Sequence, residues 1–279
     1  MQRKLKGNLL LLVLLFSFFC ALGIQKIYAR SELQRLQQNT VVSQEFRDHM
    51  LNPALLQAME KTGNPGLYAG LYLLESRFSY EKFSYPYTDD TMEKLYKKWA
   101  IKKEWTDYQN TCYAIWDDLE YFPVPDSSVD ASLTVLYSNS WMNERTFGGR
   151  RGHEGTDIMA SQNERGLYPV LSMTDGIVTS KGWLPKGGWR IGITAPRGGY
   201  FYYAHLDSYG KVEIGDEIKA GDFLGYMGDS GYGKEGTVGK FPVHLHVGIY
   251  LKKGGKEVSI NPYWILKYLE NHKLKYTFS

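Results

Sequence analysis

The stretch that decides the fold is an alternating run of side chains at residues 243–249, Val243-His244-Leu245-His246-Val247-Gly248-Ile249. Successive side chains of a β-strand point to opposite faces, so the four apolar residues share one face and the two imidazoles share the other. Most isolated pairs of this kind lie on a solvated sheet face, and the pattern alone predicts a half-buried strand. His244 and His246 become candidates for a metal site only if further ligands approach the same face.

The surrounding sequence has the same period of two, interrupted by glycine-bearing turns. Candidate strands lie at 169–173, 176–181, 190–195, 200–206, 223–228 and 243–251. Residues 196–199, Pro196-Arg197-Gly198-Gly199, suit a hairpin turn, because proline presets one dihedral angle and the glycines permit positive ones. We expect a mostly antiparallel β-sheet, followed by a short helix that opens at Asn261-Pro262.

Four of the six histidines lie between positions 153 and 246. In residues 153–157, His153-Glu154-Gly155-Thr156-Asp157, an imidazole and a carboxylate are four apart, and the glycine between them permits a bend that brings both onto one ion. His205 stands at the end of another candidate strand. A catalytic zinc ion takes three protein ligands and keeps one position open. Two histidines and an aspartate drawn from these motifs fit that rule, and two histidines then remain for proton transfer.

Three motifs, H-E-G-T-D at 153–157, Y-A-H-L at 203–206 and H-L-H at 244–246, together resemble the lysostaphin/LytM family of zinc metallopeptidases. The resemblance extends to segments at 173–178, 215–222 and 228–231, and it covers residues 150–263 in family order. It implies a compact β-sheet domain that binds one Zn²⁺ per chain. Carried over position by position, the zinc ligands are His153, Asp157 and His246, and the catalytic pair is His205 and His244.

The same resemblance implies an endopeptidase of bacterial cell-wall remodelling, which hydrolyses peptide bonds in the stem peptides or cross-bridges of peptidoglycan. Peptidoglycan peptide is then the substrate; no nucleic-acid partner is expected, and the sequence indicates no particular protein partner. The alternative is a catalytically inactive scaffold that binds the wall or regulates a partner protein. Loss of a ligand is the usual sign of that state, and every ligand position is filled here.

One segment departs from the family pattern. The family passes quickly from a Gly-x-Ser/Thr-Gly turn to H-x-H, whereas residues 232–243 intervene here. This longer loop is rich in glycine and carries Lys234, Glu235 and Lys240. A solvated excursion is the commoner outcome for such a loop, and a wall of the substrate groove is the alternative. The departure bears on specificity and leaves the chemistry unchanged.

The N-terminus has the pattern of an export or anchoring segment. Three basic residues, Arg3, Lys4 and Lys6, precede an uncharged run at 9–24. A membrane-spanning helix needs about 20 residues and a signal-peptide core roughly 7 to 15, so the length of this run lies between the two. We favour an uncleaved single-pass anchor, with the positive flank in the cytoplasm and the catalytic domain outside. The alternative is a secreted protein, released by cleavage at the small residues of 21–23.

Helix signals follow the apolar run. Asn52-Pro53 and Asn64-Pro65 each place an N-cap candidate before a proline that suits the first helical turn. Leu67, Leu71, Leu74 and Phe78 then recur at helical spacing. These signals predict a small helical module that ends before the proline-containing stretch at 122–132.

Glu75 in this module suggests a rival enzyme. The run Leu73-Leu74-Glu75-Ser76-Arg77-Phe78 resembles the Glu-Ser helix end of lysozyme-like lytic transglycosylases, in which a glutamate is the general acid. The later glycine-glutamine motif of that family is missing. A solvated or capping role is far commoner for a glutamate at a helix end.

Length and composition limit the number of domains and the kinds of cross-link that the chain can have. A chain of 279 residues can hold one catalytic domain with a smaller module or tether. Of the two cysteines, Cys20 lies in the apolar run and Cys112 has no partner, so the fold must hold without disulfides. The net charge of +3 carries no weight for function. We expect an α+β chain with a membrane anchor or signal segment at 1–30, a helical module at 31–122 and the peptidase domain at 123–279.

Overall fold

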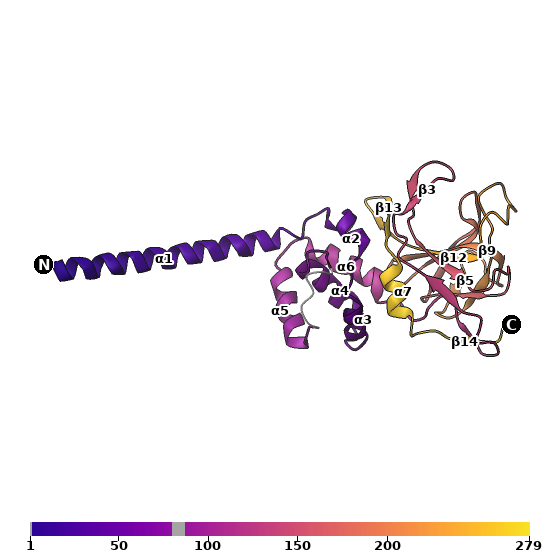
Figure 1. The fold of residues 1–279 in the computed structure, drawn as a ribbon, viewed down its shortest axis with the longest axis horizontal. Coiled ribbons are helices and arrows are strands. Elements are labelled where there is room, and N and C mark those ends of the chain that lie inside the picture. The colour runs from indigo at the N-terminus through magenta and orange to yellow at the C-terminus, as the bar shows by residue number, and fades with distance from the viewer. Residues whose placement is uncertain (1, 80–86) are drawn as a thin grey trace.

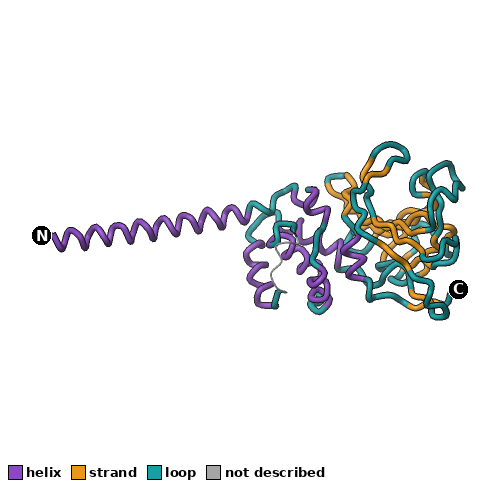
Figure 2. The backbone as a smooth tube through the Cα atoms, in the orientation of Figure 1, coloured by secondary structure: helices purple, strands orange, loops and turns teal. Residues whose placement is uncertain are grey.

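The computed structural model describes the backbone of residues 2–79 and 87–279, and within these ranges the side chains from residue 11 onward. A long helix, α1 (Gln2–Leu33), projects away from the rest of the chain (Figures 1 and 2). Its segment Leu11–Leu33 is long and apolar enough to cross a membrane, and 0% of its apolar window is buried. The expected basic cluster at 3–6 lies outside the described side chains.

Short helices form the module that follows α1. They are η1 (Thr40–Val42), α2 (Gln44–Asp48), α3 (Pro53–Glu60), α4 (Pro65–Glu75), α5 (Asp89–Trp99) and α6 (Trp105–Trp116). Asn52 caps α3 as expected, because its side-chain oxygen accepts from the amide of Ala54 at 2.9 Å. Asn64 also takes the expected N-cap position before Pro65, but its side chain accepts no capping hydrogen bond. The Gly66 amide of α4 donates instead to Asp117, at 2.8 Å.

The predicted helical spacing runs to Phe78, which lies beyond the end of α4. This helix ends at Glu75, because Arg77 and Phe78 both adopt left-handed backbone angles, with φ of 57°. The amide of Phe78 then donates to the carbonyl of Leu73 at 2.8 Å, as at the end of many helices. Phe78 still packs against the core, although it lies outside the helix.

The second half of the chain is a β structure with one further helix, α7 (Tyr263–Leu269). Its strands are β1 (Asp126–Ser127), β2 (Val135–Tyr137), β3 (Glu144–Arg145), β4 (Arg151–Gly152), β5 (Thr156–Ala160), β6 (Pro169–Leu171), β7 (Gly176–Leu184), β8 (Gly188–Thr194), β9 (Tyr200–Tyr209), β10 (Glu217–Ile218), β11 (Phe223–Met227), β12 (His244–Lys253), β13 (Lys256–Ile260) and β14 (Lys275–Tyr276). The main sheet has the order β10-β7-β8-β9-β12-β5-β2, with β11 pairing β6 and β9, and β13 pairing β12. Every ladder of this sheet is antiparallel.

All six predicted strands form, with ends that shift by a few residues, and they are β6, β7, β8, β9, β11 and β12. The predicted hairpin is confirmed, since Thr194 of β8 pairs with Tyr200 of β9 across the turn. The predicted C-terminal helix also forms, directly after Pro262. The strand β5, which carries Asp157, escapes prediction because its sequence, two polar residues followed by three apolar ones, does not alternate. Helices followed by an antiparallel sheet confirm the α+β expectation.

One apolar core runs through the helical module and the sheet. The helix α6 contacts β12, α3 contacts α7, and α2 contacts β13; Figure 1 shows α7 between the helices and the strands. At this junction the buried ring of His49 stacks on Trp116, with 5.6 Å between ring centroids, and Trp116 meets Tyr268 edge-on. Because the core is continuous, the expected division at residue 122 stays a prediction.

Candidate active site

Neighbouring strands bring the predicted residues to one face of the main sheet. His246 on β12 lies opposite Asp157 on β5 and opposite Ala204 on β9. Leu245 and Val247 are completely buried, so the alternation of β12 turns His244 and His246 to the other face. This face forms the floor of an open cleft of about 820 Å³, which all five predicted site residues line.

His205 reaches the cleft through an irregularity of β9. Tyr203 points into the core, and strict alternation would direct His205 into the core as well. Instead, His205 has a φ of 62°, and the pairing of β8 with β9 shifts register at this point. Leu206 therefore takes the next core position, and His205 turns to the cleft.

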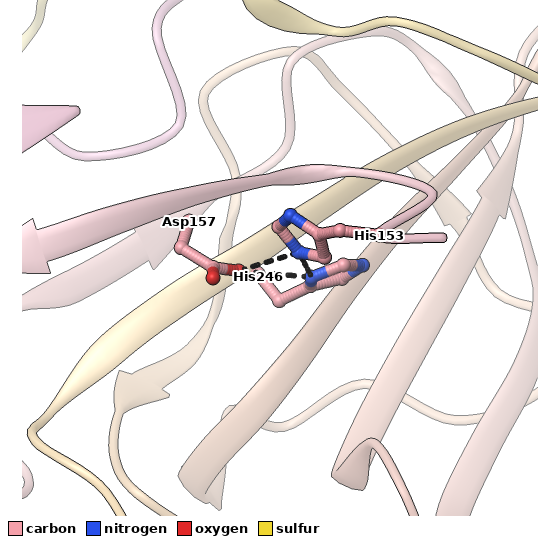
Figure 3. Close-up of side chains that lie close together, drawn as sticks. All are labelled: His153, Asp157 and His246. Atoms are coloured by element: carbon pink, nitrogen blue, oxygen red, sulfur yellow. Dashed lines mark hydrogen bonds and ion pairs between the residues drawn. The ribbon is translucent and has the colours of Figure 1, made fainter. Parts of the chain in front are cut away.

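Three of the predicted residues converge on one point, as Figure 3 shows. His153 Nε2, His246 Nδ1 and Asp157 Oδ1 form a triangle in which each pair of atoms is 3.0 Å apart. Each ring nitrogen carries at most one proton, so hydrogen bonds cannot satisfy all three edges at once. A cation at this point would satisfy all three atoms together.

The donor set fits a zinc ion. Imidazole and carboxylate are ordinary zinc ligands, and ligand atoms placed tetrahedrally at about 2.0 Å from one ion lie about 3.3 Å apart. The 3.0 Å edges of the triangle are close to that separation. Three ligands from the chain also leave a fourth position for water or substrate, which is the composition of catalytic zinc sites.

Outer contacts orient two of the three candidate ligands, His153 and Asp157. His153 Nδ1 lies 3.2 Å from the carbonyl oxygen of Ser140 and 3.1 Å from its hydroxyl. The guanidinium of Arg145 donates to Asp157 Oδ2 at 2.8 Å and lies 3.1 Å from the same nitrogen of His153. These partners hold the ring and the carboxylate in place, as outer-shell groups do at metal sites.

Two of the candidate ligands have shifted pKa values. Burial alone would raise the pKa of Asp157, but hydrogen bonds with His153 and His246 hold it far below its usual range. Burial lowers the pKa of His246, although Asp157 opposes the change. A charged carboxylate at Asp157 beside a neutral ring at His246 is the protonation state that a metal ion requires.

His205 and His244 lie beside this triangle with their orientations fixed by backbone carbonyls. His205 Nδ1 is 2.7 Å from the carbonyl of Ser230, and His244 Nδ1 is 2.8 Å from that of Pro242. If each Nδ1–H donates to its carbonyl, each Nε2 is left as a base. The His244 Nε2 atom is 3.8 Å from Asp157 Oδ1. Burial lowers the pKa of both rings, so both stay neutral at ordinary pH.

Gly155 has a steric role that its motif does not reveal. A Cβ atom at this position would lie 2.3 Å from Cε1 and 2.5 Å from Nε2 of His246. Those separations are far below van der Waals contact, so the ring of His246 occupies space that only glycine leaves free. The motif residues at 153–157 therefore shape the position of a ligand on another strand.

The long loop at 232–243 forms one wall of the cleft. Its residues Tyr232, Phe241 and Pro242 line the cleft beside His205, and the Phe241 ring lies 4.6 Å from the His205 ring. Tyr232 stacks on Phe147 of the β3–β4 hairpin, with 4.3 Å between ring centroids. The ends of the loop therefore form a groove wall, whereas Lys234, Glu235 and Lys240 between them are exposed, as expected for a solvated excursion.

Sequence reasoning misses the residues that support the site. Ser140, Arg145 and Ser230 all contact a candidate histidine or Asp157, yet only Ser230 lies within a motif, G-D-S-G at 228–231. The other two belong to the segment around the β3–β4 hairpin, which carries no recognisable pattern. Their contacts arise from the folding of this segment over the cleft.

Glu75 is outside the cleft and acts as a structural anchor. Its carboxylate accepts from Lys98 at 2.8 Å and from the indole of Trp99 at 2.8 Å. Arg35 lies 3.9 Å away. A carboxylate held by two cations and an indole is suited to joining helices, and these contacts give no support to a glycan-cleaving acid.

Comparisons with known proteins separate the two halves of the chain. Residues 151–262 match the model of peptidase family M23, and residues 31–118 match that of the LytM N-terminal domain. A curated L-Ala–D-Glu endopeptidase of Bacillus subtilis (strain 168) is 46% identical over 153 residues, which cover 54% of this chain and 44% of the relative. Lysostaphin of Staphylococcus simulans is 36% identical over 113 residues, 36% of this chain and 22% of the relative. The chain thus spans less than half the length of these relatives.

A solved structure matches almost the whole chain. The crystal structure of a candidate glycyl-glycine endopeptidase, LytM, from Ruminococcus gnavus ATCC 29149 is 53% identical to this chain. The match covers 89% of this chain and 99% of the other, with a TM-score of 0.83. The likeness therefore includes the helical module together with the sheet that carries the candidate site.

Proposed function

The chain belongs to peptidase family M23, and we propose that it is a zinc-dependent endopeptidase that hydrolyses peptide bonds in peptidoglycan stem peptides or cross-bridges. One observation carries the proposal. It is the triangle of His153 Nε2, Asp157 Oδ1 and His246 Nδ1, with 3.0 Å edges, at the floor of an open cleft. The relatives named as endopeptidases of L-Ala–D-Glu and glycyl-glycine bonds supply the substrate class.

In this proposal, His153, Asp157 and His246 hold one Zn²⁺ ion. When bound, zinc acidifies water and polarises a carbonyl group, which is the chemistry that amide hydrolysis needs. Arg145 and Ser140 keep two of the ligands oriented. The pairing of Asp157 with Arg145 also balances the buried negative charge before the ion binds.

The roles of His205 and His244 follow from their ring nitrogens. Each Nδ1–H donates to a carbonyl, so each Nε2 can accept a proton at the cleft face. Their lowered pKa values keep the rings neutral, which suits one to take a proton from attacking water. Once protonated, the same ring can deliver that proton to the leaving amine or donate to the oxyanion.

Digestion of purified peptidoglycan tests this function. The zinc-loaded full chain in detergent should release fragments with new amino groups, and a chelator should stop the release. Mass analysis of the fragments identifies the bond that is cut. Binding without any cleavage would instead support the inactive scaffold, and altered sugars would point to a glycan-cleaving enzyme.

We propose further that α1 anchors the catalytic domain on the outer side of the cell membrane, with a cleaved signal peptide and secretion as the alternative. Its unburied apolar segment at 11–33 supports an anchor. Sequencing the mature N-terminus separates the two. An anchor keeps Met1 or Gln2 as its first residue, whereas a start near Ile24 would contradict the anchor.

A further inference from the structure

The side of the cleft formed by β7, β8 and β9 carries a cation without a counter-charge. Arg190 of β8 lines the cleft, and its Nη1 atom is buried without any hydrogen-bond partner. Among the described residues, no carboxylate lies within 4.0 Å of this guanidinium, and no aromatic ring is stacked on it. Placing a charged group out of water without a partner is costly, so a retained charge of this kind calls for an explanation.

The carboxylates that line the cleft are engaged elsewhere or form no ion pair with Arg190. Asp157 accepts from Arg145 and lies among the imidazoles. Glu154 accepts from Arg47 at 3.0 Å. Glu257 is exposed on β13, and the described residues give it no ion pair with Arg190. None of the described carboxylates therefore pairs with Arg190, which leaves its guanidinium available to an anion from outside the chain.

The surroundings of Arg190 are built to hold it in place. Its backbone amide and carbonyl both bond to the hydroxyl of Tyr209, at 3.1 and 3.0 Å. Its charge acts on the phenols of Tyr200 and Tyr202, which lie on the cleft face of β9. Two glycines make room for these rings, since a Cβ at Gly192 or Gly187 would overlap a tyrosine hydroxyl. The guanidinium thus projects from a rigid strand, as a recognition group should.

Arg190 lies two strands away from the candidate metal centre. Strand β9 lies between β8, which carries Arg190, and β12, which carries His246, and neighbouring strands are about 4.8 Å apart. Successive residues of an extended peptide are about 3.3 to 3.6 Å apart, so a span of about 10 Å corresponds to roughly three residues of substrate. A peptide with its scissile bond at the centre would therefore pass Arg190 with a neighbouring residue.

We propose that Arg190 is a specificity-determining residue that binds a carboxylate of the substrate peptide within about three residues of the scissile bond. This inference rests on the proposed peptidase function and narrows its substrates to acidic peptides. Guanidinium and carboxylate match as a bidentate pair, which a carboxamide cannot reproduce. The carboxylate comes from an acidic residue inside the peptide or from its free C-terminus.

Four synthetic peptides containing an L-Ala–D-Glu bond distinguish these sources. They combine a free or amidated D-Glu α-carboxyl group with a free or amidated C-terminus, and each is cleaved by the zinc-loaded full chain in detergent. The parent should show a KM about 30-fold lower for the peptide with the relevant carboxylate. Arg190→Gln should abolish that preference while kcat changes little, and Arg190→Lys should restore part of it. The peptide pair that carries the preference identifies the bound group.

Lys186→Gln is the matched control, because Lys186 is a cation that also lines the cleft. It should leave the preference within about threefold of the parent. Equal losses in Arg190→Gln and Lys186→Gln would mean a diffuse positive field and would overturn the assignment to Arg190. An unchanged preference in Arg190→Gln, or equal KM values for all four peptides in the parent, would overturn it too. A zinc-loaded parent that cleaves none of the peptides or purified peptidoglycan would instead defeat the proposed function.

Calorimetric titration of the chelator-treated full chain with the same peptides provides a readout that is independent of turnover. The parent should bind the carboxylate peptide more tightly than its amide by a similar factor, and Arg190→Gln should bind the two equally. Equal binding by the parent would overturn the proposal. The folded state of Arg190→Gln can be checked by its zinc content, which should equal that of the parent.

Discussion

Histidine side chains are buried in two regions of this molecule, and the two regions treat them differently. In the helical module, both ring nitrogens of His49 have complementary partners. Nδ1 lies 3.1 Å from the carbonyl of Phe46, and the indole of Trp116 donates to Nε2 at 2.8 Å. In the cleft, His153, His246 and Asp157 have more close contacts than protons to share among them.

Burial therefore does not by itself identify a functional histidine. A buried polar group is ordinarily satisfied, and His49 conforms to that rule. The triangle in the cleft does not follow that rule, and one bound cation would satisfy its three atoms. The rings of His205 and His244 lie beside the triangle and can act as bases. The comparison makes the incomplete pairing, and not the number of histidines, the mark of the site.

The largest effect is expected from removing a proposed metal ligand. His153→Ala or His246→Ala leaves two ligands from the chain, so zinc affinity should fall steeply and peptide cleavage should vanish. His49→Ala is the comparison within the other region, and it should retain about one zinc per chain wherever the protein folds. Metal analysis of the purified proteins beside cleavage rates checks both. Full zinc content in His246→Ala would show that the triangle is not the metal site.

A smaller loss should follow from the proposed catalytic pair. His205→Ala and His244→Ala remove a base from the cleft face while leaving the three ligands in place. Both variants should keep zinc and lose roughly 100-fold or more in kcat. The same zinc and rate measurements apply. Loss of the metal in either variant, or cleavage as fast as in the parent, would break the division between ligands and catalytic groups.

Gly155→Ala should displace one proposed ligand, His246, without removing it. The added methyl group would lie 2.3 Å from the His246 ring, so the ring must shift. Zinc affinity should fall by about 10- to 100-fold, in the range seen when ligand orientation is disturbed. Gly23→Ala is the matched control, since nothing lies within 4 Å of its Cβ position. Competition with a metal-binding dye measures the affinity, and equal values in both variants would refute the steric role.

The parts of this site that short motifs encode can be predicted from the sequence. The alternation in β12 places His244 and His246 on one face, and the spacing of His153 and Asp157 permits a shared ion. The turn of His205 into the cleft depends on a left-handed φ and a register shift, which neither its neighbours nor the strand period predict. The sequence therefore predicts that His205 lies near the end of a strand, but it does not predict how the ring turns into the cleft.

Long-range contacts account for what the sequence does not predict. Arg145 approaches Asp157 through a hairpin without a motif, and Gly155 clears space for a ring on a different strand. The capping of α4 by Asp117 is of the same kind, because residues far apart in sequence meet only after α4 and α6 pack. Each of these contacts follows from tertiary structure, which local patterns cannot specify.

The smallest effect on activity, and a distinct effect on stability, is expected at His49. Burial lowers the pKa of His49 to about 4, from an ordinary value of 6.5. Above pH 6.5 the ring is neutral in both the folded and the unfolded chain, so pH has no effect through this group. As the pH falls below 6.5, the unfolded chain binds a proton that the folded chain refuses. The free energy of unfolding should therefore decrease by about 3 kcal/mol between pH 6.5 and 4, and no further below that.

His49→Gln tests this dependence, because its amide can still accept from Trp116 but does not titrate. The variant should be less stable than the parent at pH 7, yet the gap between the two should close as the pH falls to about 4. Urea unfolding followed by tryptophan fluorescence, at several pH values, measures that gap. Taking the difference between variant and parent cancels the titration of the cleft histidines, which both proteins share. A gap that stays constant with pH would show that His49 is charged or exposed in the folded chain, and the contrast between the two buried regions would then fail.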